Sequence, residues 1–144
     1  MLVYLAARYS RRDELRLIRD ELQRRGHVVT SRWLDTEWSE KPPKERQGLD
    51  HSSAAPPEYR QRHVIEDVED VLTAACMISF TEQPRSDGRG GRHVEFGIAL
   101  ATGKRLVVVG PRENLFHYHP RVEHYDDVAN MLRNVFDGEK YGGA

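Results

Sequence analysis

Short apolar runs alternate with amphipathic stretches along most of this 144-residue chain. Runs of four or five residues rich in aliphatic and β-branched side chains are typical of strands that are buried on both faces of a parallel sheet. Five runs are expected to form strands, at residues 2–6, 27–31, 76–80, 105–109 and 122–125.

The stretches between these runs have helical periodicity. In the first stretch, apolar residues recur at i, i+3 and i+7, and a glycine follows where a left-handed residue commonly ends a helix. These residues are Leu15, Ile18, Leu22 and Gly26. Ser10 or Asp13 is expected to cap this helix. The expected helices span residues 11–25, 57–75, 93–102 and 128–136.

This alternation predicts right-handed βαβ crossovers, and therefore an α/β fold whose five-stranded parallel sheet has helices on both faces. In such sheets ligands bind beyond the carboxyl ends of the strands, which here selects residues 6–12, 81–95 and 110–119. Residues 35–58 are rich in Pro, Gly and Ser and predict a long functional loop within a single domain. This loop is a candidate lid, since Trp38 within it and Trp33 just before it could cover a base.

Composition excludes several classes of protein. The chain has 22 Lys and Arg against 23 Asp and Glu, and this net charge of -1 argues against binding a nucleic acid polymer by phosphate neutralisation. The single Cys76 excludes an internal disulfide. The longest aliphatic run, residues 106–109, is far shorter than the roughly 20 residues of a membrane span. Arginines follow the first apolar run, whereas a signal peptide has them before it, so a cytoplasmic protein is expected.

Glu95 is the sharpest candidate for chemistry. It follows a glycine-rich stretch and is expected in the first turn of an otherwise apolar helix, where backbone amides and the helix dipole favour an ionised carboxylate. Such a carboxylate at the mouth of a cleft can attack a carbon centre and form a covalent intermediate. The alternative is that Glu95 only complements the helix dipole.

Two further candidates are Asp67 and Tyr4. Asp67 belongs to an acidic helical segment, for which a solvated surface is the default interpretation. Tyr4 lies in the first expected strand. A buried tyrosine hydroxyl needs a partner, and a carboxylate is a good one.

Arginines flank two of the three predicted cleft stretches, and their guanidinium groups suit phosphate oxygens. They are Arg8, Arg11, Arg12, Arg85, Arg89 and Arg92. The glycines near Lys104 lack P-loop spacing, and residues 88–93 lack the third glycine of a dinucleotide fingerprint. His117, His119 and His124 could bind a metal, but no thiolate supports such a site, and ordinary loop histidines are the preferred interpretation. We therefore expect no metal and no cofactor.

Taken together, several motifs resemble the nucleoside 2-deoxyribosyltransferase superfamily, which also includes N-hydrolases of nucleoside monophosphates. The resemblance is carried by residues 3–7, Asp67, residues 90–99 (Gly-Gly-Arg-His-Val-Glu-Phe-Gly-Ile-Ala) and residues 103–109 (Gly-Lys-Arg-Leu-Val-Val-Val). Short phage proteins with a stretch like residues 110–117 are also similar. The resemblance implies a flavodoxin-like fold and a small-molecule nucleoside or nucleotide as substrate.

The resemblance also implies roles for three residues in cleaving an N-glycosidic bond. Glu95 matches the nucleophile that attacks the anomeric carbon, Asp67 the acid that protonates the base, and Tyr4 the residue that orients the nucleophile. Another base (transfer) or water (hydrolysis) then resolves the glycosyl-enzyme. Two carboxylates in different environments suit the roles of nucleophile and acid.

One departure concerns the 5′ end of the sugar. The transferases hold the 5′-hydroxyl with an aspartate six residues before the nucleophile, where this chain has Arg89; a loop shift would let Asp87 restore the contact. The monophosphate hydrolases use a serine there, with Ser and Arg groups after the first strand, where Ser10 and Arg8 lie. Transfer and hydrolysis are both compatible with the sequence.

Other residues are expected to contact the substrate because they lie in the predicted cleft: Ala6, Gly90 and Gly91, with Asn114, Phe116 and His117 lining a base pocket. Relatives complete their sites across subunits, so a homo-oligomer is expected. Two alternative functions are a nucleotide-sensing module without turnover and cleavage of the nicotinamide–ribose bond of NAD.

Overall fold

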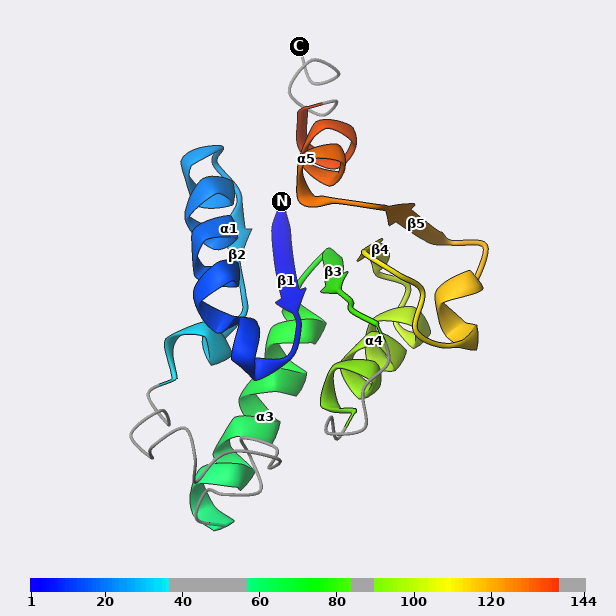
Figure 1. The fold of residues 1–144 in the computed structure, drawn as a ribbon. Helices are drawn as coiled ribbons and strands as arrows, with labels where there is room; N and C mark the ends of the chain where they lie inside the picture. Colours follow the sequence, from blue (N-terminus) through cyan, green and yellow to red (C-terminus); the bar gives the residue numbers. More distant parts are fainter. Residues whose placement is uncertain (37–56, 84–89, 138–144) are drawn as a thin grey trace.

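The computed structural model describes residues 1–36, 57–83 and 90–137 (Figure 1). Most of the expected lid, including Trp38, lies outside the described residues. The same is true of Arg85, Asp87 and Arg89.

A five-stranded sheet forms the centre of the fold, and every neighbouring pair of strands is parallel. The strand order β2-β1-β3-β4-β5 is that of flavodoxin-like proteins and confirms the expected fold class. The strands are β1 (Leu2–Ala6), β2 (Val28–Val29), β3 (Cys76–Phe80), β4 (Arg105–Val109) and β5 (Val122–Tyr125). Four of the five predicted strands have the predicted bounds.

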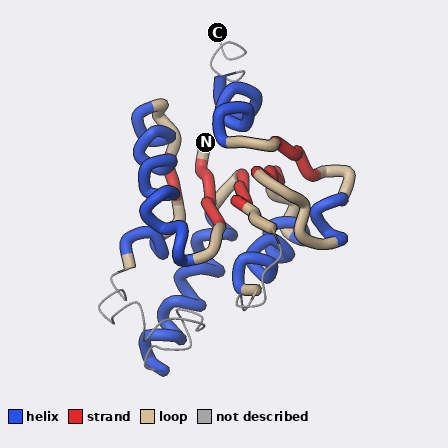
Figure 2. The backbone as a smooth tube through the Cα atoms, in the orientation of Figure 1, coloured by secondary structure: helices blue, strands red, loops and turns tan. Residues whose placement is uncertain are grey.

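Helices cover both faces of this sheet (Figure 2). They are α1 (Arg12–Arg24), α3 (Pro57–Thr73), α4 (Gly91–Ala101) and α5 (Val128–Met131), which continues as the π-helical turn η5 (Leu132–Asp137). Three short 3-10 turns are η1 (Tyr9–Arg11), η2 (Arg32–Asp35) and η4 (Leu115–Tyr118). Among the described residues, no helix combines the length and apolarity needed to cross a bilayer.

Two local predictions were wrong. The second strand is two residues long because the Ser31 side chain replaces the ladder: its Oγ accepts from the Leu5 N–H (2.7 Å) and donates to the Leu5 carbonyl (3.2 Å). Neither Ser10 nor Asp13 caps α1, because the chain enters this helix through η1 and Arg11 takes the N-cap position without a side-chain hydrogen bond.

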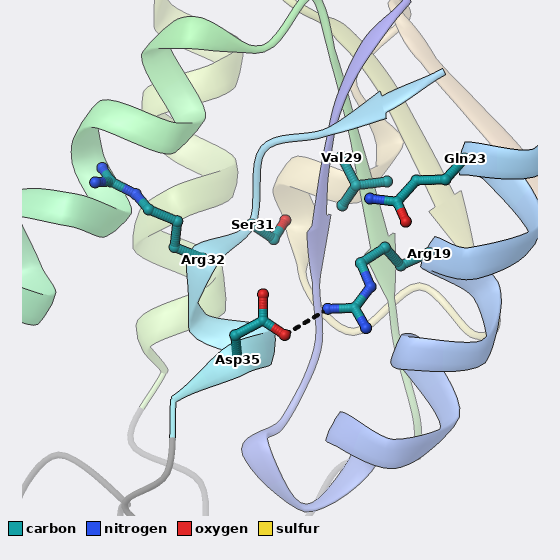
Figure 3. Close-up of a pocket in the computed structure, with 6 residues that line it drawn as sticks. All are labelled: Arg19, Gln23, Val29, Ser31, Arg32 and Asp35. Atoms are coloured by element: carbon teal, nitrogen blue, oxygen red, sulfur yellow. Dashed lines mark hydrogen bonds and ion pairs between the residues drawn. The ribbon is translucent and has the colours of Figure 1, made fainter. Parts of the chain in front are cut away.

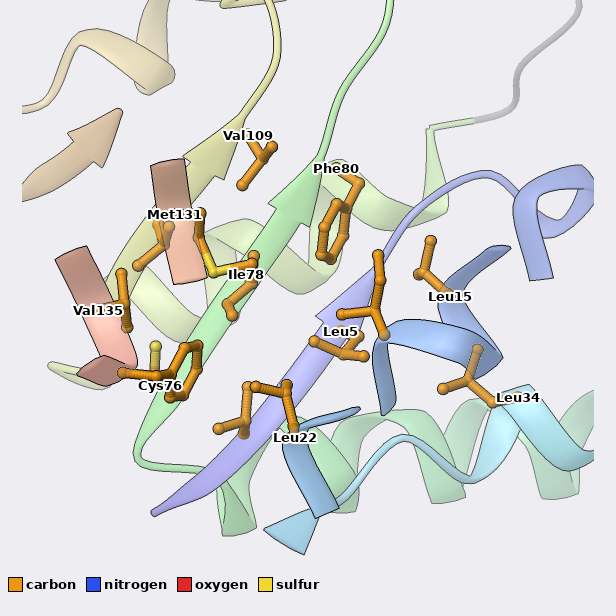
Figure 4. Close-up of a cluster of buried hydrophobic side chains, with 14 residues drawn as sticks. Leu5, Leu15, Leu22, Leu34, Cys76, Ile78, Phe80, Val109, Met131 and Val135 are labelled. Carbon is orange, nitrogen blue, oxygen red and sulfur yellow. The ribbon is translucent and has the colours of Figure 1, made fainter. Parts of the chain in front are cut away.

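Alternate residues of each strand face opposite helical layers. Val3, Leu5, Ile78 and Phe80 pack against α1 and the α5–η5 segment in one apolar cluster (Figure 4). Tyr4 points to the opposite face of the sheet and belongs to a second apolar cluster, which packs against α3 and α4. Its other strand residues are Ala6, Met77, Leu106 and Val108, and the residues that it includes from the helices and the turn after α3 are Val71, Ala74, Phe96 and Ala99. The alternation therefore points the Tyr4 side chain towards the two helices that carry Asp67 and Glu95.

The strand order reverses at β1. The chain passes from β1 to β2 on one side, and then crosses back to β3 on the other. In open α/β sheets this reversal leaves a crevice beyond the carboxyl ends of the two strands, where ligands bind. The residues after Ala6 and Phe80 therefore define the expected location of a site.

Gly110, which follows β4, offers a test of the packing beside this crevice. Its φ is +111°, and a Cβ there would lie 2.7 Å from Thr81 Oγ1 and 2.9 Å from the Thr81 carbonyl oxygen. We expect Gly110→Ala to lower the free energy of unfolding in urea by about 2–4 kcal/mol, because backbone strain and overpacking add. Gly26→Ala is the control: φ is +89° but no atom lies within 4 Å, so about 1 kcal/mol is expected. Equal losses for the two variants would contradict the close packing of Gly110 on Thr81.

Candidate active site

A contact between β1 and α4 forms the centre of the candidate site. The Tyr4 side chain is fully buried, and its hydroxyl donates a hydrogen bond to Glu95 Oε2. Burial and the neighbouring carboxylates raise the pKa of Tyr4 well above its ordinary value, so the hydroxyl keeps its proton and acts as a permanent donor. The prediction that a carboxylate partners Tyr4 is confirmed.

Glu95 lies deeper in α4 than its sequence predicts. Since the helix begins at Gly91, Glu95 is in the second turn, and no acidic residue lies in the first. Burial raises the pKa of Glu95 to about 8, and the charge of Asp67 adds to this rise, whereas the Tyr4 hydrogen bond opposes it. The expectation that helix amides hold Glu95 ionised is therefore wrong, because desolvation outweighs the favourable contact.

Asp67 faces the same region from α3. Its Oδ1 is buried and makes no hydrogen bond with any described residue. Burial raises the pKa of Asp67 to about 7, with smaller contributions from the charges of Asp70 and Glu66. A buried oxygen without a partner is costly unless something else binds it, so Asp67 differs from the solvated carboxylate that the acidic segment suggested.

Asp70 is the acidic residue that the sequence analysis did not single out. It is 5% exposed and accepts hydrogen bonds from the Arg32 N–H and Nε, both at 2.9 Å. This pair anchors α3 to η2. The i, i+3 spacing places Asp67 and Asp70 on one face of the helix. Nothing in the local sequence indicates that Arg32 pairs with Asp70 and not with Asp67.

The residues after β1 and β3 meet at the strand reversal. Arg8 Nη1 lies 2.8 Å from Glu82 Oε1, and the two side chains are only 15% and 18% exposed. Arg11 Nη1 donates to the Thr81 carbonyl at 3.1 Å. Ser10, by contrast, is exposed in η1. Sequence reasoning did not single out Glu82, and the available signal was an acidic residue two positions beyond a fully buried strand.

A second polar network joins the start of α4 to the loop after β4. Arg92 Nη2 lies 2.6 Å from Glu113 Oε1 in a buried ion pair. The Glu113 N–H donates to His117 Nδ1 (3.0 Å), and Asn114 Nδ2 lies 3.2 Å from His93 Nδ1. This network holds the loop against the helix that carries Glu95.

The residues expected to line a base pocket therefore have partners within the protein. His117 is 1% exposed, and its ring packs edge-on against Phe96, with ring centroids 4.9 Å apart. Asn114 Oδ1 accepts from the Phe116 N–H as the cap of η4, and the Phe116 ring is exposed. Gly90 is the left-handed N-cap of α4, and Gly91 is its first residue.

Two shallow pockets lie on the β2 side of the fold. One, of about 310 Å³, is bridged by an ion pair between Arg19 and Asp35 (2.7 Å; Figure 3). Its lining also includes Gln23, Val29, Ser31 and Arg32. The other, of about 290 Å³, is lined in part by His63 and Glu66, and His63 lies one helical turn before Asp67.

Two solved structures share this fold over nearly their whole lengths. A 2-deoxyribosyltransferase from the psychrotolerant bacterium Bacillus psychrosaccharolyticus is 16% identical, with a TM-score of 0.67 over 96% of this chain and 95% of that one. The CMP N-glycosidase BcmB of Clostridium botulinum is 19% identical, with a TM-score of 0.54 over 94% of this chain and 98% of that one. Neither a family model nor a curated protein matches the sequence. The likeness confirms the flavodoxin-like fold that the resemblance implied.

The raised pKa of Asp67 predicts how stability depends on pH. Its folded pKa of about 7 exceeds the ordinary value of 3.8, so the folded state binds this proton more tightly and loses stability as pH rises between those values. Asp67→Asn removes the ionisation. Wild type therefore loses stability between pH 5 and pH 8, whereas Asp67→Asn does not. We expect the free energy of unfolding of Asp67→Asn minus that of wild type to increase by about 1–3 kcal/mol over this range.

Urea unfolding at the two pH values measures this difference. Glu69→Gln is the matched control, since the Glu69 side chain is 60% exposed on the same helix. A pH-independent difference between Asp67→Asn and wild type would show that Asp67 titrates normally.

Proposed function

We propose that this protein cleaves the N-glycosidic bond of a nucleoside or its 5′-monophosphate through a covalent glycosyl intermediate on Glu95, and transfers the sugar to another nucleobase. The observation that carries the proposal is the buried Tyr4–Glu95 contact, which lies near the Asp67 carboxyl of a neighbouring helix; Asp67 Oδ1 is buried without a hydrogen bond to any described residue. The shared fold of the two glycosyl-processing enzymes supports it.

In the first step the ionised Glu95 attacks the anomeric carbon. A C1′–O bond forms as the C1′–N bond breaks, and the bonding electrons leave with the base. Protonated Asp67 delivers its proton to the departing nitrogen, which makes the base a neutral leaving group. Tyr4 donates to one oxygen of Glu95 and thereby leaves the other as the attacking atom.

The second step reverses the first. An acceptor base attacks C1′, the glycosyl ester breaks, and Glu95 regains its negative charge. The Asp67 carboxylate takes the proton that the acceptor nitrogen loses, and the site returns to its starting state. Water in place of the base gives hydrolysis.

The two raised pKa values indicate that Asp67 and Glu95 share a proton near neutral pH. Because Asp67 and Glu95 are both buried and repel one another, the pair retains at least one proton near pH 7. The reactive state carries one negative charge, on Glu95, and one proton, on Asp67. In the free protein the pKa of Glu95, about 8, is above that of Asp67, about 7, so the shared proton resides more readily on Glu95. The Tyr4 hydrogen bond narrows this difference by stabilising charge on Glu95, and the reactive state is reached when the proton moves from Glu95 to Asp67.

Hydrolysis to a free base and a sugar phosphate is the second candidate, supported by the fold shared with a CMP N-glycosidase. A nucleotide-sensing module without turnover would use the same residues for binding alone. The homo-oligomer, the cytoplasmic location and the phage origin stay predictions.

Replacement of the nucleophile tests the chemistry directly. We expect Glu95→Gln to lower base release at least about 1,000-fold, because the amide cannot form the glycosyl ester. Chromatography of a panel of nucleosides and monophosphates, with and without a free acceptor base, measures release and distinguishes transfer from hydrolysis. Glu69→Gln is the control. Wild-type turnover retained in Glu95→Gln, or tight binding without release in wild type, would refute the proposal.

Replacement of the donor tests the role of Tyr4. Since its hydrogen bond lowers the pKa of Glu95, Tyr4→Phe raises that pKa, and the acidic limb of the pH–rate profile is expected to move to higher pH by about one unit. We also expect kcat to fall by about 10- to 100-fold. Tyr118→Phe, at an exposed position, is the control. An acidic limb that stays in place would show that Tyr4 only fills space.

A further inference from the structure

Asp70 joins α3 to the segment that follows β2. Thr30 Oγ1 donates to the Asp70 carbonyl oxygen at 2.8 Å. The Arg32 N–H donates to Asp70 Oδ2 and Arg32 Nε donates to Asp70 Oδ1, both at 2.9 Å. The Asp70 side chain is 7% exposed, whereas that of Arg32 is 51% exposed. A half-exposed arginine on η2 therefore supplies the positive charge for a buried carboxylate on α3.

The Arg32 side chain is directed towards α3. Figure 3 shows it extending from η2 away from the ion pair between Arg19 and Asp35. Its Nη2 also lies 2.9 Å from Glu69 Oε2, at an exposed carboxylate on the same helix. Of these two carboxylates Asp70 is the buried one, so its attraction to Arg32 is the less screened by water and salt.

The charge of Asp70 acts on the carboxyls that share a proton. Asp70 lies three residues after Asp67 on α3, and its charge also reaches Glu95 and Tyr4. Burial is the largest cause of the raised pKa of Asp67, the charge of Asp70 raises it further, and Arg32 lowers it. In the described part of the chain, the charged and titratable groups of this cluster are Arg32 on η2, Glu66, Asp67, Glu69 and Asp70 on α3, Glu95 on α4 and Tyr4 on β1.

We propose that Arg32 is a positioning residue of the candidate site: by pairing with Asp70 it offsets the negative charge beside Asp67 and Glu95, so that these two carboxyls can hold one negative charge between them. This inference rests on the proposed function, because the reactive state needs an ionised Glu95 while Asp67 keeps its proton. Arg32 acts through Asp70 and not on the substrate.

The alternative is that the pair only anchors η2 to α3. An anchor needs no charge, since the oxygen of an uncharged side chain could accept from the Arg32 N–H. A charged pair has a second consequence. An unneutralised Asp70 would repel an ionised Asp67 or Glu95 in surroundings from which water is largely excluded, and this would favour the state in which both keep a proton.

Opposite substitutions in the ion pair separate the effect of charge from anchoring. Arg32→Gln removes the positive charge, so the apparent pKa values of the Asp67–Glu95 pair are expected to rise by about 0.5–1 pH unit. Asp70→Asn removes the negative charge, and the same values are expected to fall by about as much. The measurement is an NMR titration of the side-chain carboxyl carbons, which needs no substrate. Glu69→Gln, which removes the exposed partner of the same arginine, is the control and should move both values by less than about 0.2 pH unit.

Arg32→Lys is a second test, because it keeps the charge and loses the planar fork of donors. We expect it to retain the wild-type pKa values. Loss of anchoring alone would admit water and lower the pKa values in every variant of the pair. Unchanged or lowered values in Arg32→Gln would therefore overturn the inference, and so would lowered values in Arg32→Lys. If Arg32→Gln does not fold, Arg32→Lys decides between the two roles.

The pH–rate profile of base release is measured separately. Its acidic limb is expected to move to higher pH in Arg32→Gln and to lower pH in Asp70→Asn, because the limb follows the ionisation of Glu95. If release is absent while the titrations shift as expected, the proposed function fails and the electrostatic role of Arg32 stands. If release occurs but Arg32→Gln does not raise the pKa values, the proposed function stands and the role of Arg32 fails.

Discussion

The hydrogen bond from Tyr4 to Glu95 joins the centre of the sheet to the helix that covers it. A buried hydroxyl and a buried carboxylate each need a hydrogen-bond partner, and here the two groups bond to one another. The apolar side chains around them exclude water, which makes the contact strong and also makes the negative charge on Glu95 costly. Asp67 and Asp70 lie near this contact, which is therefore the centre of the candidate site.

The carboxyl groups of Asp67, Asp70 and Glu95 lie near Tyr4, and they differ in their partners. Asp70 is held by Arg32, whereas Asp67 and Glu95 have no cationic partner among the described residues. Their mutual repulsion destabilises the folded protein at neutral pH, and a purely structural arrangement would not need it. Such pairs of titratable groups, whose environments raise the pKa of each, are typical of sites that move protons.

The electrostatics of the crevice also differ from what its arginines suggest. Counted along the chain, Arg8, Arg11 and Arg92 indicate an anion site. In the folded protein each of these three arginines is paired with a carboxylate of the described residues. The pairing shows why a count of arginines along the chain is a poor guide to the charge that a ligand meets.

The elements of the fold could be predicted because their signals are local. β-branched runs, the i, i+3, i+7 recurrence before Gly26 and the small residues of α4 depend on neighbours within a turn or a strand, and four strands have the predicted bounds. Tyr4, Asp67 and Glu95 could be named as candidates from their residue types and a family resemblance. Their environments could not, since Tyr4 meets Glu95 across 91 positions of the chain and Arg8 meets Glu82 across 74. Desolvation and pairing arise only when distant elements pack together, and these two effects set which carboxylate keeps a proton and which arginine keeps its charge exposed.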